Sequence, residues 1–133
     1  MLLAALDIFF HALHLFVILF NLLGWAHVRT RRAHRWLVAG TAFFWLVIGP
    51  LYGALGYCPL TGWHWDVKTA RGEGPLPASY IDYLLQMAGI HAPPQSIDIA
   101  VGTVFFAVCV VTLYLWRRDK RRAAAVLFKS SSV

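Results

Sequence analysis

Three long apolar segments constrain this chain more than any other feature of its sequence. They run from Leu2 to Trp25, from Trp36 to Tyr57 and from Ile97 to Trp116. A helix that crosses a hydrocarbon core of about 30 Å needs about 20 residues, and each segment meets that length. Each is continuously apolar rather than alternating, which is typical of helices rather than barrel strands. We therefore predict an all-α integral membrane protein with three transmembrane helices, forming one domain over residues 1–133.

The positive charges are concentrated on one side of these segments. Of the 12 lysines and arginines, only Lys68 and Arg71 lie in the segment 58–96 between the second and third helices. The positive-inside rule therefore places the N-terminus in the periplasm and the C-terminus in the cytoplasm of a bacterial inner membrane. Nucleic acid is a poor explanation of cations placed in this way. We expect nine of them to contact anionic lipid headgroups: Arg29, Arg31, Arg32, Arg35, Arg117, Arg118, Lys120, Arg121 and Arg122.

The connections between the helices carry further expectations. The basic linker 26–35 is short, so the first two helices should be antiparallel neighbours. Gly49-Pro50 predicts a kink in the second helix, because proline lacks the amide hydrogen and clashes one turn back. Gly49 and Gly53 form a small-xxx-small pair that would let another helix approach closely, and packing within the chain is favoured over a contact with another molecule. The first helix should remain uncleaved, and the basic tail 117–133 should be frayed or lie on the membrane surface.

The outer segment 58–96 combines a predicted ordered loop with a short helix. Its first part is rich in tryptophan, proline and glycine, which indicates a loop. Ser79 and Asp82 then resemble a capping box, and Gly89 is placed to end the helix that follows. Because apolar residues recur on one face of this segment, we predict an amphipathic helix at the outer membrane interface.

Polar residues in the first apolar segment are the leading functional candidates. Asp7, His11, His14 and Asn21 recur at helical spacing and share one face. Ionisable groups inside a membrane are costly and usually face the bundle interior. The two histidines could bind a metal with Asp7, one could ligate haem, or the stripe could relay protons. The structural alternative is that these side chains only hydrogen-bond to the other helices.

A second polar cluster lies in the outer segment and comprises Cys58, Thr61, His64, Asp66 and Lys68. By topology it is on the same side as Asp7, so His11, His14 and His64 could converge as metal ligands. The spacing is not diagnostic, because the sequence has no CxxC, HExxH or CxxCH motif. The tryptophans that flank His64 could equally anchor a loop at the headgroups. Cys58 and Cys109 should be too far apart along the membrane normal to form a disulfide.

Several segments together carry a resemblance to a known family. They include LDIFFHALHLFVILFNLLGW, the FFW of the second helix, LYGALGYCPLTGWHWDVK and GEGPLPASYIDYLL. The chain resembles a domain-of-unknown-function family of small bacterial inner-membrane proteins marked by a Cys-Pro-Leu-Thr segment. The resemblance covers most of residues 6–90 and implies that His14, Cys58, Pro59 and Thr61 belong to the family motif. His64 and Lys68 stand where the commoner branch has an acidic residue and an arginine, and the resemblance implies no activity.

These observations favour a non-catalytic accessory or structural subunit of a larger membrane complex, for example an energy-transducing one. The partners expected are the bilayer and other membrane subunits. The main alternative is a redox protein that binds metal or haem through Asp7, His11 and His14. Proton, ion or small-solute transport by an oligomer is a weaker alternative, because three helices alone cannot enclose a pathway.

Overall fold

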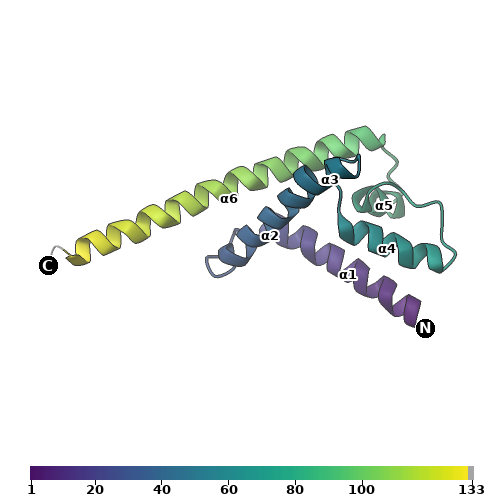
Figure 1. The fold of residues 1–133 in the computed structure, drawn as a ribbon, viewed down its shortest axis with the longest axis horizontal. Helices are drawn as coiled ribbons and strands as arrows, with labels where there is room; N and C mark the ends of the chain where they lie inside the picture. Colours follow the sequence, from purple (N-terminus) through teal and green to yellow (C-terminus); the bar gives the residue numbers. More distant parts are fainter. Residues whose placement is uncertain (132–133) are drawn as a thin grey trace.

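The computed structural model describes residues 1–131, and all its regular elements over that range are helices, which confirms the predicted all-α class. The last two residues of the predicted tail, 132 and 133, lie outside the described residues. The elements are α1 (Leu2–Leu23), α2 (Arg31–Phe43), η1 (Phe44–Ile48), α3 (Gly49–Leu51), α4 (Pro59–Ala70), α5 (Tyr80–Met87) and α6 (Pro94–Ser131). Figure 1 shows α1 beside α4 and α6 as a long helix that ends far from the rest of the fold.

Two of the helices are long and apolar enough to cross a membrane. They are α1 and the Pro94–Phe128 part of α6, and few of the residues in either apolar stretch are buried. Since an apolar helix that remains exposed is unfavourable in water, this pattern is consistent with a membrane protein.

The second predicted span is helical but is not one regular α-helix. It begins at Arg31 rather than Trp36 and ends at Leu51 rather than Tyr57. The expected irregularity near Gly49-Pro50 takes the form of the π-helical turn η1 immediately before it. A wider turn at this point accommodates a proline that cannot donate a backbone hydrogen bond. The helical run from Arg31 to Leu51 is still about 30 Å long.

The small-xxx-small prediction for Gly49 and Gly53 is wrong. Gly53 lies beyond the end of α3, where its φ of +70° forms the turn out of the helix. Gly49 is buried and does allow a close approach, but to the chain that immediately follows. A Cβ at this position would overlap the carbonyl oxygen of Ala54 and lie 3.3 Å from the Cβ of Tyr57.

The first part of the outer segment is a helix rather than the predicted loop. Pro59 is the first residue of α4, where its missing amide hydrogen costs nothing and its φ suits a helix. The later prediction for α5 is confirmed: the Asp82 amide donates to the Ser79 Oγ at 3.2 Å. Gly89 has a φ of +77°, and the Ile90 amide closes the helix end on the Leu85 carbonyl at 2.8 Å. The placement of α5 at a membrane interface remains a prediction.

A small core holds the long helices together. Figure 1 shows α1 and the run from α2 to α3 diverging from the short connection 24–30 in opposite chain directions, as expected for antiparallel neighbours. The buried apolar side chains are Val38, Tyr80, Ile97, Val108 and Leu115. Polar contacts supplement them, since the His34 Nε2 lies 2.9 Å from the Asn21 carbonyl oxygen. Cys58 and Cys109 are both free thiols, as predicted.

The basic tail continues α6 as helix to Ser131 and is therefore more regular than expected. Its alanine, lysine, arginine and leucine residues are strong helix formers, and Lys120 lies over the Trp116 ring at 4.3 Å. Arg31 forms an ion pair with Asp119 at 3.1 Å and so joins the start of α2 to this part of α6.

Replacing Gly49 by alanine tests whether this close approach fixes the end of the second helical run. We expect Gly49→Ala to destabilise the protein by about 1–3 kcal/mol, because the obstructing atom is backbone and cannot rotate away. Thermal unfolding in detergent micelles measures the change. Gly40→Ala is the matched control: a Cβ added there would meet nothing within 4 Å, and alanine should leave stability unchanged or slightly higher. Equal midpoints for the two variants would show that the contact at Gly49 does not matter.

Candidate functional site

A buried polar cluster joins the N-terminal half of α1 to α4 and α5. The Asp7 carboxylate is its centre. One oxygen, Oδ1, accepts from the His64 Nε2 at 2.8 Å and lies 3.1 Å from the Lys68 Nζ. The other oxygen, Oδ2, pairs with the Arg71 guanidinium. Three groups from α4 and its C-terminal end therefore converge on one carboxylate of α1.

Lys68 is the most unusual member, because its ammonium is almost completely buried. Its side chain is 4% exposed, and Nζ also donates to the Glu73 Oε2 at 2.9 Å. Burial alone would lower the pKa of Lys68, but hydrogen bonds to Tyr83, Glu73 and Asp7 outweigh it and raise the pKa above its ordinary value. Arg71 reaches Glu73 as well, at 3.4 Å. Lys68 and Arg71 therefore form a charge-balanced group of four with Asp7 and Glu73.

Tyr80, the first residue of α5, closes the cluster from the other side. Its hydroxyl lies 2.9 Å from the His11 Nδ1, and its ring stacks on His14 with centroids 4.0 Å apart. Burial raises the pKa of Tyr80 to about 12, so the hydroxyl keeps its proton and can donate it to the imidazole. This contact attaches α5 to α1 without involving α4.

The start of α4 meets His14. The Nδ1 of His14 lies 3.3 Å from the Phe10 carbonyl, which can only accept, so Nδ1 carries the hydrogen. In the neutral ring Nε2 then has a free lone pair. The Thr61 hydroxyl is 3.3 Å from this nitrogen and the Cys58 thiol is 3.9 Å from it. Both groups can donate to the same acceptor.

His64 has one unsatisfied nitrogen in the centre of the cluster. The residue is fully buried, and because Nε2 donates to Asp7, Nδ1 is left as an acceptor with no partner in the described chain. Burial lowers the pKa of His64, and the bond to Asp7 opposes this shift without reversing it. The ring therefore favours the neutral form.

The structure merges the two sets of residues that the sequence suggested separately. Asp7 and His14 pair with Cys58, Thr61, His64 and Lys68 because α1 and α4 run antiparallel along their polar faces. His11 lies between them and pairs with Tyr80 of α5. Two predicted members lie elsewhere. Asn21 bonds to the Val17 carbonyl at 3.1 Å and the Thr41 hydroxyl at 3.4 Å, and Asp66 is exposed.

Four members of the cluster were not predicted as site residues: Arg71, Glu73, Tyr80 and Tyr83. A usable signal existed for one of them. His64, Lys68 and Arg71 are spaced four and three apart, the same spacing as Asp7, His11 and His14. That match becomes visible only once α4 is recognised as a helix.

The cluster as it stands does not form a metal centre. Ring centroids lie 5.7 Å apart for His14 and His64 and 6.2 Å apart for His11 and His64. Within residues 1–131, however, no group of three or more histidine, cysteine or carboxylate side chains is arranged to hold a metal ion. The three histidines predicted as metal ligands, His11, His14 and His64, therefore lie near one another without being arranged around one ion. The contacts that the cluster does make hold α1, α4 and α5 together.

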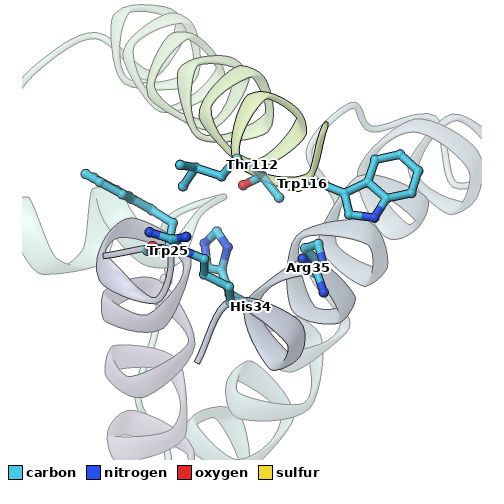
Figure 2. Close-up of a pocket in the computed structure, with 7 residues that line it drawn as sticks. Trp25, His34, Arg35, Thr112 and Trp116 are labelled. Atoms are coloured by element: carbon cyan, nitrogen blue, oxygen red, sulfur yellow. Dashed lines mark hydrogen bonds between the residues drawn. The ribbon is translucent and has the colours of Figure 1, made fainter. Parts of the chain in front are cut away.

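The residues predicted to contact lipid lie at the other end of the long helices. Arg31, Arg32, Arg35 and Arg122 line an open cavity of about 400 Å³ together with Val28 and Asp119. Next to it is a much smaller cavity of about 10 Å³, drawn in Figure 2, where Trp25, His34, Arg35, Thr112 and Trp116 surround room for about one water molecule. Neither cavity is lined by the other cations of these two segments, which are Arg29, Arg117, Arg118, Lys120 and Arg121.

Removing the Asp7 charge should loosen α4 from α1. Asp7→Asn leaves the buried Lys68 ammonium and Arg71 with Glu73 as their only carboxylate partner. We expect the free energy that holds α4 on α1 to fall by about 2–3 kcal/mol, less than for a fully buried pair because the site is partly exposed. Hydrogen exchange of the α4 amides in micelles measures this loss locally. Asp66→Asn removes the same charge from an exposed position of α4 and should leave exchange unchanged. Equal hydrogen-exchange rates of the α4 amides in the two variants would show that Asp7 does not hold α4 on α1.

His64 should make this attachment sensitive to acid. Because its pKa is lower in the folded state than the ordinary 6.5, the unfolded state binds the proton more readily. The stability that neutral His64 contributes is therefore present above about pH 6.5 and lost as the pH falls below it. We expect the melting temperature to fall between pH 7.5 and 5.5, and to fall less in His64→Gln. His91→Gln, at an exposed position, should behave like the parent protein; an unchanged pH response in His64→Gln would contradict this assignment.

Comparison with known proteins agrees with the resemblance inferred from the sequence. The family model described as "Protein of Unknown function (DUF2784)" matches residues 4–117, a longer stretch than the resemblance suggested. No curated protein and no solved structure matches the chain. The match covers α1 to α5, the whole polar cluster, and α6 as far as Arg117. The chain belongs to this family of proteins of unknown function.

Proposed function

We propose that the protein crosses the bacterial inner membrane three times, with its N-terminus in the periplasm, and acts as a non-catalytic accessory subunit of a larger membrane complex. The lengths of α1 and α6 and the helical run from Arg31 to Leu51 support three crossings. The arginines near residues 29–35 and 117–122 support the orientation, because they mark one end of all three runs. The polar cluster and α4–α5 then lie on the periplasmic side, with α5 at the interface.

The observation that carries the accessory role is the surface of the α4–α5 part of the fold. Outside the long helical runs, large apolar side chains remain exposed at Leu55, Trp63, Met87 and Ile90. At the same time the polar side chains of the cluster around Asp7 are bonded to one another. Exposed apolar side chains on helices that are held in place by polar contacts are typical of a surface that binds another protein.

A redox or metal-binding role is the second candidate, and one observation favours it. The Nδ1 of His64 is buried with no partner in the described residues, and in the same cluster the Cys58 thiol lies 3.9 Å from the His14 Nε2. Soft sulfur and imidazole ligands suit transition metals. Two or three of these side chains would have to rotate to share one ion.

Purification from the native membrane in mild detergent tests both candidates on one sample. We expect the tagged chain to co-purify with a partner at fixed stoichiometry, and Trp63→Glu to abolish that association because a charge would be buried in the contact. Thr69→Glu adds the same charge at an exposed polar position of α4 and should leave the complex intact. A solitary chain, or a complex that tolerates Trp63→Glu, would contradict the proposal. Stoichiometric metal or a Soret band in the same sample would favour the redox role instead.

A further inference from the structure

The cavity lined by arginines at the junction of α2 and α6 has the composition of an anion site. Arg31, Arg32 and Arg35 come from the first turns of α2, and Arg122 comes from α6 beyond Trp116. The two helices are far apart in sequence, so the cavity exists only because α6 folds back against the start of α2. The cavity has a volume of about 400 Å³ and opens widely to its surroundings.

The charges of this cavity are not balanced by the protein. Asp119 is the single carboxylate in its lining, and it is engaged by the Arg31 NH1 at 3.1 and 3.4 Å. Arg31 is held further by a bond from its Nε to the Trp25 carbonyl at 3.0 Å. No residue in the described part of the chain forms an ion pair with Arg32, Arg35 or Arg122. Three guanidinium groups therefore lie around the cavity without a counter-charge.

The chemistry of the unpaired groups selects phosphate. A planar guanidinium donates two parallel hydrogen bonds to phosphate oxygens, and several around one cavity suit a group with multiple charged oxygens. The immediate surroundings are those of a membrane interface, since Trp25 and Trp116 line the adjoining small cavity. Val28 adds an apolar wall. A ligand with a phosphate head and an apolar body fits this combination better than a free ion does.

We propose that this cavity binds the phosphate group of an anionic phospholipid and that the bound headgroup bridges α2 and α6. The choice of a lipid rests on the proposed topology, which places the cavity at the cytoplasmic surface where anionic headgroups lie. Like the Arg31–Asp119 ion pair, the lipid links the two helices, because Arg32 and Arg35 come from α2 and Arg122 comes from α6.

Binding of phosphatidylglycerol to the purified full-length chain tests the proposal without any partner protein. Native mass spectrometry and the melting temperature in mixed micelles should report retained phosphatidylglycerol and a higher midpoint, compared with phosphatidylcholine. In the double variant Arg35→Gln with Arg122→Gln, affinity should fall at least about tenfold, because two charged contacts are lost. The control is the double variant Arg29→Gln with Arg121→Gln, which removes the same charge from the same two segments outside the cavity lining. Arg29 and Arg121 are exposed, so they should contact headgroups only as single surface charges, and this variant should lose no more than about twofold in affinity.

Each other outcome overturns the proposal. Equal losses in the two double variants would mean that the lipid responds only to overall charge. Equal retention of phosphatidylcholine would remove the requirement for an anionic headgroup. Inorganic phosphate that raises the melting temperature as much as the lipid does would assign the cavity to a soluble ion. Circular dichroism of both double variants establishes that they fold. Because no partner is present, failure here leaves the accessory role standing, and failure of the partner experiment leaves this site standing.

Discussion

The charged contacts between α1 and the α4 region converge on one carboxylate. Asp7 lies in an otherwise apolar helix, and its two oxygens receive His64, Lys68 and Arg71 from a segment more than fifty residues away. Apolar helices surrounded by lipid gain little from one another by the hydrophobic effect, so polar contacts decide which faces meet. Asp7 supplies the carboxylate that the α4 face carrying His64 and Lys68 meets on α1, and His14 meets Thr61 at the start of the same helix. This contact fixes α4 along α1, and the contact of Tyr80 with His11 adds α5.

The two ends of the molecule treat charge in opposite ways. In the polar cluster around Asp7, Lys68 and Arg71 are matched by Asp7 and Glu73, and His64 favours its neutral form. The positive and negative charges of the cluster are therefore balanced, which suits a group that holds helices in place. At the other end one aspartate faces four arginines across an open cavity. Unbalanced charge next to an open volume attracts a ligand, whereas balanced charge in a closed volume stabilises a fold.

The sequence was most informative where local chemistry decides local structure. Apolar length predicted α1 and the spanning part of α6, and Ser79 with Asp82 and Gly89 predicted the two ends of α5. It failed where distant contacts override local preference. The segment that forms α4 contains Gly62 and is interrupted by tryptophans, so its own composition favours a loop. It becomes a helix because His64, Lys68 and Arg71 then present one polar face to a partner face on α1.

The packing of α4 on α1 also explains the Cys-Pro-Leu-Thr segment in physical terms. Pro59 restricts the residue before it to an extended backbone, and Cys58 has φ −119° and ψ 114°. The chain therefore turns abruptly into α4 at this point, with the thiol and the Thr61 hydroxyl both directed at His14. A lone pair on the His14 Nε2 accepts one hydrogen bond, and the hydroxyl is both closer and the better donor. The thiol is then the group left without a strong partner. The arrangement thus uses Thr61 to dock the start of α4 on His14 and leaves the half-buried Cys58 thiol as the more distant neighbour, at 3.9 Å.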